Sequence, residues 1–417
     1  MCYNATISII FYGANMSSLK LHGVNKMYTS GTLALYDANL ETTDKEFVVV
    51  LGADESGKST LLRVIAGLED VSDGEIFIGD RDVTEVDPKD RDIAMVFRNN
   101  TLYPALNVFD NMAFGLKLRK ASSALIEQRV KAAAKILGLE DILYRKPKTL
   151  TAAQRQRVAI GRAIVREPKI YLLDEPLAGL DEKLKAELLN VIINIQARME
   201  GTFLYATKNL SEAMTIGTRI IVMKNGTIQQ IDTPANLYDY PVNAYVAFYI
   251  GAPSINFVNN AKIVKTDDGV FVEEGDFKLK LSDKIISRFE KIDEYANTEK
   301  GVILGIRPED MQTVKGSGAE VGKIENDGDD YYAECKYSGH TFVVKTQKEQ
   351  SSGSCGLEID FDRVHLFDGE TRLTLLSRDD GYQKTGFADA DRVPLTFPEE
   401  EELLKTLKAK KAEKKKK

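Results

Sequence analysis

The sequence predicts an α/β fold built on a largely parallel sheet, followed by a smaller all-β domain. In the first half, apolar β-branched runs alternate with stretches of helical spacing, which is typical of a parallel sheet covered by helices. Beyond about residue 256, short β-rich runs are separated by Gly, Asp and Ser, as in small β-barrels. A chain of 417 residues is also long enough for roughly two or three domains.

The α/β half is expected to alternate strands and helices along the chain. Strands are expected in the apolar runs at residues 46–52, 92–97, 169–175, 202–207 and 219–226. Helices are expected at residues 58–68, 108–137, 182–199 and 210–214, and from about Ala153 onward. We therefore predict four parts: residues 1–16, a loose N-terminal extension; 17–235, the α/β domain with a helical subdomain at about 99–165; 236–378, connecting helices and the β-barrel domain; and 379–417, a polar Lys-rich tail.

The composition argues against several classes of protein. The longest apolar runs are far shorter than the ~20 residues that a membrane-spanning helix needs, and the first residues lack the basic start of a secretory signal. A net charge of -7 gives no support to nucleic acid as the main partner. The three cysteines, Cys2, Cys335 and Cys355, fit a reducing compartment, and no disulfide is expected between the last two.

Residues 52–60, GADESGKST, match the pattern G-x-x-x-x-G-K-[ST] between a predicted strand and a predicted helix. Backbone N–H groups of such a loop, together with the helix N-terminus, form a concave site for phosphates. Lys58 is expected to reach the terminal phosphates and Ser59 to ligate magnesium. The predicted nucleotide-binding loop consists of Gly52, Ala53, Asp54, Glu55, Ser56, Gly57, Lys58, Ser59 and Thr60.

Two carboxylates, Asp174 and Glu175, follow the apolar strand predicted at residues 169–175. A carboxylate at such a strand end can hold magnesium through water, and the next one can orient and deprotonate an attacking water. The sequence therefore predicts ATP and Mg²⁺ as cofactors, with Ser59 and Asp174 on the metal and Glu175 as the catalytic base.

From about residue 19 to residue 378, the chain resembles the ATP-binding subunits of bacterial ABC importers of the maltose and glycerol-phosphate type. The resemblance rests on the loop above and on the stretches IAMVFRNNTLYPALNVFDNMAFGLK, LTAAQRQRVAIGRAIVREPKIYLLDEPLAGLD, SEAMTIGTRIIVMKNGTIQQ and GIRPED. It implies an ABC nucleotide-binding domain with a helical subdomain, followed by an oligomer-binding-like (TOBE) regulatory domain. It also implies that Tyr28 stacks on adenine, that Asp174 is the Walker B aspartate and that Asp181 is the D-loop aspartate.

The resemblance further implies a set of partners and a location. The subunit would work as a dimer with a second ABC subunit, identical or different, beneath transmembrane permease subunits. An extracellular solute-binding protein would act indirectly, and no nucleic acid would bind. The protein would lie at the cytoplasmic face of the plasma membrane, as a peripheral ATPase that drives uptake of a sugar or related solute.

The chain departs from this family at several positions around the ATP site. Arg98 replaces a glutamine, Lys208 replaces the switch histidine, and Asp54 and Glu55 stand where residues are usually small and neutral. The signature loop, usually Leu-Ser-Gly-Gly-Gln, is here Leu150, Thr151, Ala152, Ala153 and Gln154.

These departures predict retained ATP binding and slow hydrolysis. The Cβ atoms of Ala152 and Ala153 crowd the approach of backbone donors to the γ-phosphate on the opposite subunit and disfavour a positive φ. A protonated Lys208 has no acceptor lone pair, so it cannot align water as imidazole does. The two new acids, Asp54 and Glu55, are candidates for pairing with Arg98 or Lys208, and the sequence leaves open whether these side chains meet.

Two other classes of function remain as alternatives to the transport ATPase. A nucleotide-gated regulatory or assembly subunit with little turnover is favoured by the degenerate loops, which unselected drift would also produce. A soluble ABC protein acting on ribosomes or DNA is disfavoured by the acidic balance and by the absence of a second cassette. The transported solute and the identity of the dimer partner stay open.

Overall fold

The computed structural model describes residues 17–99, 101–328, 330–346 and 353–379. The expected N-terminal extension, and the Lys-rich tail beyond Asp379, lie outside the described residues. The chain divides into two compact units, Met1–Thr227 and Ile228–Lys417, and the domain boundary at residue 235 stays a prediction. Within the described ranges, no helix is both long enough and apolar enough to cross a membrane.

The main sheet has the strand order β10-β9-β3-β8-β7-β6. Its strands β3, β8, β7 and β6 pair in parallel, as does β9 with β3, which confirms the predicted parallel sheet. Every residue of β3, β7 and β8 is buried, as expected where helices cover both faces. The strands are β3 (Phe47–Leu51), β6 (Ile93–Val96), β7 (Ile170–Asp174), β8 (Thr202–Thr207), β9 (Arg219–Lys224) and β10 (Thr227–Asp232).

A second, antiparallel sheet of the first unit has the order β2-β1-β4-β5. In β1 and β2, buried side chains alternate with half-buried or exposed ones, the pattern of a sheet with one face toward the core. The strands are β1 (Leu19–Met27), β2 (Leu33–Glu41), β4 (Asp73–Ile78) and β5 (Arg81–Asp82).

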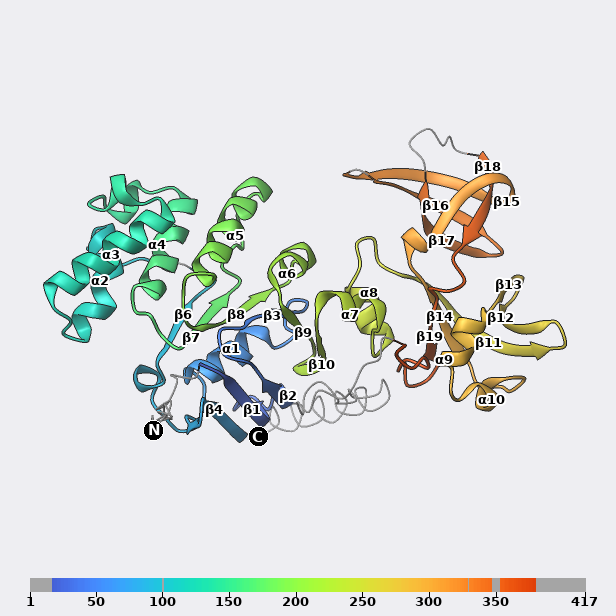
Figure 1. Cartoon of the computed structure of the whole chain (residues 1–417), viewed down its shortest axis with the longest axis horizontal. Coiled ribbons are helices and arrows are strands. Elements are labelled where there is room, and N and C mark those ends of the chain that lie inside the picture. The colour runs from blue at the N-terminus through green and yellow to red at the C-terminus, as the bar shows by residue number, and fades with distance from the viewer. Residues whose placement is uncertain (1–16, 100, 329, 347–352, 380–417) are drawn as a thin grey trace, which may run out of the picture. The chain divides into compact units, whose positions relative to one another are not determined.

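Six helices complete the described part of the first unit, and α2, α3 and α4 pack together as a helical subdomain (Figure 1). The N-caps of α2 and α3 are Asn107 and Ser122, whose side chains accept from backbone N–H groups of the first turn. The helices are α1 (Lys58–Ala66), α2 (Val108–Leu118), α3 (Ser123–Leu137), α4 (Ala152–Ile164), α5 (Glu182–Gln196) and α6 (Leu210–Ile216).

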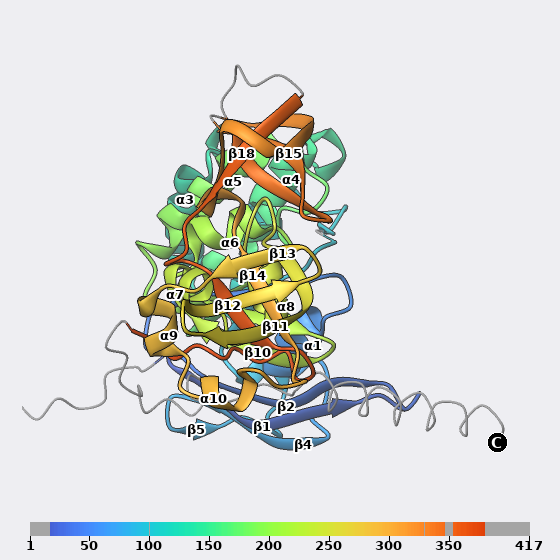
Figure 2. The same ribbon diagram turned by 90° about the vertical axis from the view of Figure 1, so that its right-hand side faces the viewer.

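The second unit is rich in β-structure, as predicted, and its described residues form two sheets with orders β13-β12-β11-β14-β19 and β16-β17-β15-β18. Figure 2 labels β11 to β14 of the first of these sheets and β15 and β18 of the second. Its strands are β11 (Asn256–Thr266), β12 (Gly269–Glu274), β13 (Phe277–Lys280), β14 (Val302–Ile306), β15 (Met311–Asp327), β16 (Asp330–Tyr337), β17 (His340–Thr346), β18 (Gly353–Ile359) and β19 (His365–Asp368). Its helices are short: α7 (Pro234–Asp239), α8 (Ala244–Tyr249), α9 (Asp283–Arg288) and α10 (Ile292–Tyr295).

One apolar core joins the two sheets of this unit, with buried side chains from β11, β14, β15 and β17 among others. Strand β15 pairs with both β18 and β16, and its register shifts between Val314 and Ala319. Gly318, at φ 117°, supplies the conformation that this irregularity requires. Cys335 and Cys355 are buried and carry free thiols.

Candidate functional site

The predicted phosphate loop, residues 52–60, connects β3 to the start of α1. Gly57 is the N-cap of α1 at φ 102°, and a Cβ there would lie 2.9 Å from the carbonyl oxygen of Ala34. Only glycine fits both constraints. Glu55 also adopts a positive φ, 64°, which is unfavourable for a residue with a Cβ. The loop therefore has the left-handed turns that direct backbone N–H groups toward a bound anion.

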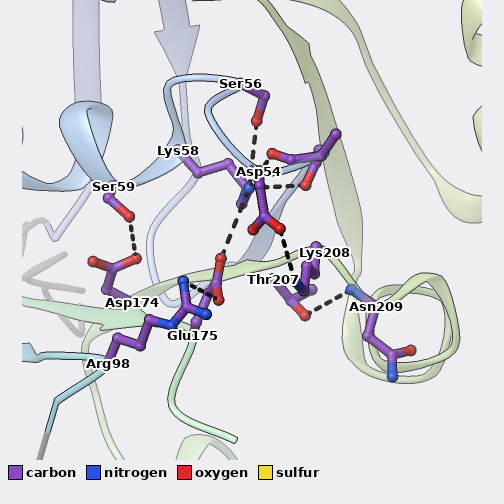
Figure 3. A network of polar contacts seen from close by, with 12 residues as sticks. Asp54, Ser56, Lys58, Ser59, Arg98, Asp174, Glu175, Thr207, Lys208 and Asn209 are labelled. Atoms are coloured by element: carbon purple, nitrogen blue, oxygen red, sulfur yellow. Dashed lines mark hydrogen bonds and ion pairs between the residues drawn. The ribbon is translucent and has the colours of Figure 1, made fainter. Parts of the chain in front are cut away.

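The structure brings most of the predicted site together around this loop. Figure 3 shows these side chains: Asp54, Ser56, Lys58, Ser59, Arg98, Asp174, Glu175 and Lys208.

Lys58 is buried within its own loop, with only 4% of its surface exposed. Its Nζ donates to the carbonyl oxygens of Gly52, at 2.8 Å, and Ala53, at 2.6 Å. Burial lowers the pKa of Lys58, and the carboxylate of Glu175, 3.9 Å away, opposes that shift. A phosphate would therefore meet an ammonium group that the loop already holds at its centre.

Ser59 and Asp174 lie together as predicted for a magnesium site. The Ser59 hydroxyl donates to Asp174 Oδ1 at 2.7 Å, and Asp174 is 3% exposed. A hydroxyl and a carboxylate are the hard oxygen ligands that Mg²⁺ accepts. Among the described residues, no three His, Cys, Asp or Glu side chains are arranged to hold a metal by themselves. The pair would supply two of the oxygen ligands of a magnesium ion.

Glu175 follows β7 in a strained backbone conformation, with φ 44°. Its N–H donates to Ala206 O at 3.0 Å, and its side chain is 8% exposed. Arg98 Nη1 lies 3.3 Å from Glu175 Oε2, so the arginine that replaces the family's glutamine directly contacts the expected base. A non-glycine residue held at positive φ beside a phosphate loop indicates a functional constraint.

Lys208, on the turn between β8 and α6, forms an ion pair with Asp54 of the phosphate loop, Nζ to Oδ2 at 2.8 Å. Both side chains are more than half exposed, at 51% and 61%. The hydrogen bond from Lys208 and its charge lower the pKa of Asp54. The structure thus answers the question that the sequence left open, because the side chains of Asp54 and Lys208 do meet.

Glu212 is a positioning residue that the sequence reasoning missed. Its carboxylate accepts from Tyr205 Oη at 2.9 Å and from Thr207 Oγ1 at 2.7 Å. The Asn209 side chain caps α6 by accepting from Glu212 N. Burial, and then the Glu212 charge, raise the pKa of Tyr205. The spacing Asn-x-x-Glu, typical of a helix start, was the available signal. This network holds the turn that carries Lys208.

The signature loop forms the N-terminus of α4. Thr151 is the N-cap, Gln154 N donates to its Oγ1 at 3.2 Å, and Gln154 Oε1 accepts from Thr151 N at 3.0 Å, which completes a capping box. Ala152 and Ala153 are the first two helical residues. The expectation that their Cβ atoms matter by disfavouring a positive φ is therefore wrong, because a helix start needs a negative φ. The steric argument about approach to a γ-phosphate is unaffected.

Several predicted residues lie elsewhere. The described hydrogen bonds and ion pairs do not join Leu150–Gln154 to the phosphate loop. Asp181 is the N-cap of α5, where its side chain accepts from Leu184 N at 3.0 Å. Tyr28 lies in the turn between β1 and β2, with Lys26 Nζ 5.2 Å from its ring centre. Adenine stacking by Tyr28 and the role of Asp181 stay predictions.

A large cavity, with a volume of about 920 Å³, lies in the first unit. Its walls come from β6, the segment after it, α2 and α4. Phe97, Tyr103 and Leu118 line it and are 43%, 38% and 70% exposed. Exposed apolar groups in a cavity of this size are typical of a site that receives another chain.

The comparisons with known proteins agree with this geometry. The ABC transporter family matches residues 35–178, and the MalK OB fold domain matches residues 251–311. The oligosaccharides import ATP-binding protein MsmX of Bacillus subtilis is 41% identical over 86% of this chain and 100% of its own length. The trehalose/maltose import ATP-binding protein MalK of Thermococcus litoralis is 42% identical over 85% of this chain and 99% of its own.

The solved structures show the same architecture for the first unit. The structure of cbiO1 from Clostridium perfringens, part of the ABC transporter complex cbiONQ, has a TM-score of 0.50 and 28% identity. The match covers 53% of this chain and 90% of that one. With a phosphate loop, a hydrogen-bonded Ser59–Asp174 pair and a buried glutamate in place, this chain belongs to the family of ATP-binding subunits of ABC importers, of the type that carries a MalK OB-fold domain.

Proposed function

We propose that this protein binds Mg-ATP and hydrolyses it slowly to drive uptake of a sugar or related solute. The relatives named for oligosaccharide and trehalose/maltose import support the solute class. Lys58 and the loop N–H groups would bind the phosphates, while Ser59 and Asp174 would hold magnesium, which would neutralise phosphate charge. These relatives are import proteins, so they lend no support to the alternative of an inactive regulatory subunit.

The contact between Arg98 and Glu175 carries the proposal of slow hydrolysis. The guanidinium lies 3.3 Å from one carboxylate oxygen, and an attacking water must compete with it for that acceptor. A glutamine, by contrast, offers both an acceptor and a donor to water and carries no charge. The Lys208–Asp54 pair adds a second obstacle, because a γ-phosphate that needs Lys208 must draw it away from Asp54.

The partners follow from the family and from the large cavity in the first unit. We infer that its exposed apolar side chains, Phe97, Tyr103 and Leu118, receive a cytoplasmic helix of a permease subunit. The protein would then be peripheral at the cytoplasmic face of the membrane. A second ABC subunit would supply the signature loop to each nucleotide site, and a solute-binding protein would act through the permease.

The substitution Glu175→Gln tests the proposal of a hindered base. We expect single-turnover phosphate release to fall less than about tenfold, because the steps blocked by Arg98 and Lys208 already limit the rate and such effects are not additive. Glu200→Gln, an 87% exposed carboxylate, is the matched control and should leave the rate unchanged. A thousandfold fall from a fast starting rate would show that the site works unhindered.

A further inference from the structure

Asp54 adds a negative charge to a loop whose other groups favour a bound anion. Its carboxylate pairs with Lys208 Nζ at 2.8 Å, and Figure 3 shows the two side chains directed toward each other. Among the described residues, Asp54 forms no second ion pair. A phosphate that enters the loop would therefore meet this carboxylate as well as the backbone N–H groups and the ammonium group of Lys58.

The neighbouring charges place the Asp54 carboxylate toward the end of the site where a third phosphate would lie. The N–H groups of the loop are expected to hold the first two phosphates of a nucleotide, whereas Glu175 would act on the third. Arg98 lies at this base, with Nη1 3.3 Å from Glu175 Oε2. Lys208 has the largest effect in lowering the pKa of Asp54. The charges of Lys58 and Arg98 lower it further, so the carboxylate is ionised and lies within electrostatic range of both groups.

The Asp54–Lys208 pair is solvent-exposed, so it can open when a nucleotide binds. Lys208 is 51% exposed and Asp54 is 61% exposed, and ion pairs at such positions contribute little to stability. A third phosphate would therefore take Lys208 from Asp54. This exchange would leave an ionised carboxylate without its partner beside a newly bound anion, and like charges at such short range repel even in water. A diphosphate, which ends before the pair, would avoid this repulsion.

We infer that Asp54 removes the preference of this site for a triphosphate over a diphosphate, so that Mg-ADP binds at least as tightly as Mg-ATP. The inference rests on the proposed function, because it concerns the same nucleotide site. Its consequence is that ADP, the product of hydrolysis, competes with ATP for the loop. The proposed slow turnover would then slow further as ADP accumulates.

The test compares Mg-ADP with the magnesium complex of adenylyl-imidodiphosphate, an ATP analogue whose bridge between the second and third phosphates resists hydrolysis. Both are titrated by calorimetry into the full chain. The protein concentration is one at which light scattering shows a monomer, so that dimerisation does not add to the affinity for the analogue. We expect the dissociation constant of Mg-ADP to be equal to or lower than that of the analogue.

Asp54→Asn is the decisive variant, because it removes the charge and keeps the size of the side chain. It should tighten binding of the analogue about tenfold and change the affinity for Mg-ADP less than about twofold, since Lys208 becomes available to the third phosphate. The ligand-free melting temperature should stay the same, because the pair is exposed. Asp293→Asn, which opens the exposed pair of Lys265 and Asp293 in the second unit, is the matched control and should leave both affinities unchanged.

Lys208→Gln tests the same pair from its other side. It leaves Asp54 ionised and without this partner, so the analogue should bind about tenfold more weakly while the affinity for Mg-ADP stays the same. Adding Asp54→Asn to Lys208→Gln should recover the lost affinity for the analogue, because no carboxylate of this pair then faces the third phosphate.

Two results would overturn the inference. One is an affinity for the analogue that exceeds the affinity for Mg-ADP in the unmodified chain. The other is an Asp54→Asn variant in which the affinities for both nucleotides change equally or not at all. Either result leaves the proposed binding of magnesium nucleotides intact. Failure of both nucleotides to bind the unmodified chain would instead refute the proposed function together with this inference, so the two kinds of failure are distinguishable.

Discussion

The phosphate-loop face is the set of side chains Asp54, Lys58, Arg98, Glu175 and Lys208. This face and the signature loop, Leu150–Gln154, depart from the family pattern in different physical ways. On the phosphate-loop face the new side chains contact groups of the same site, Lys208 with Asp54 at 2.8 Å and Arg98 with Glu175 at 3.3 Å. At the signature loop two alanines extend a well-capped helix start and make no described contact with that face. The substitutions on the phosphate-loop face change the charges around the phosphate loop. The two alanines change a surface that a second subunit would contact. The two sets should therefore affect different steps of the cycle.

The most severe change to the phosphate-loop face is Lys58→Ala. We expect it to abolish the rise in melting temperature caused by Mg-ATP, which corresponds to about 2.7 kcal/mol at a hundred times the dissociation constant. Thermal unfolding with and without Mg-ATP is the measurement. Lys135→Ala, an exposed lysine on α3, should keep the full shift. An undiminished shift in Lys58→Ala would remove this loop from the nucleotide site.

The second largest effect is expected from replacing the two cations Arg98 and Lys208 with the residues of the family pattern. Arg98→Gln combined with Lys208→His should raise phosphate release by the ATP-bound dimer at least about tenfold, or about 1.4 kcal/mol in the barrier. The reason is that Glu175 regains an unobstructed carboxylate and the γ-phosphate regains an imidazole. Arg198→Gln with Lys183→His, two exposed positions, controls for surface charge. If this repair had no effect while glycines at the signature loop restored fast hydrolysis, the arginine and lysine would be competent replacements.

Repair of the signature loop should change dimerisation rather than the rate of hydrolysis. Ala152→Gly with Ala153→Gly should strengthen ATP-induced dimerisation several-fold, by about 1 kcal/mol, with little gain in turnover, because closure improves while the chemistry stays hindered. Light scattering beside phosphate release separates the two effects. Ser123→Gly with Ala124→Gly alters the same two positions of α3 and should leave dimerisation unchanged. Only the variant with all four repairs should recover both properties.

The smallest expected effect concerns the strained Glu55. Glu55→Gly should stabilise the folded chain by about 0.5–1 kcal/mol, because glycine adopts φ 64° without a Cβ penalty. Urea unfolding without nucleotide measures this change. Glu85→Gly, at an exposed position without a positive φ, should destabilise instead. A loss of stability in Glu55→Gly would show that this side chain makes a contact that outweighs its strain.

Sequence reasoning predicted the parallel sheet, the phosphate loop and the Ser59–Asp174 pair, because these depend on local pattern and on neighbouring strand ends. It left open the meeting of Lys208 with Asp54, since side-chain pairing across 154 positions depends on how two loops approach in space. It missed Glu212, whose burial follows from the packing of Tyr205 and α6. It also assigned a φ effect to Ala152 and Ala153, because the family has glycines there, whereas the Thr151–Gln154 capping box makes these two alanines the first helical residues.

The exposure of the Lys208–Asp54 pair also determines how ionic strength acts on this protein. At cellular salt, charges are screened over about 8 Å, so dissolved ions loosen the attraction between Asp54 and Lys208. The same ions weaken the attraction of ATP to the loop, and these two effects oppose each other when the phosphates displace Asp54. The affinity for ATP should consequently vary less with salt concentration here than in relatives whose phosphate loop carries no carboxylate.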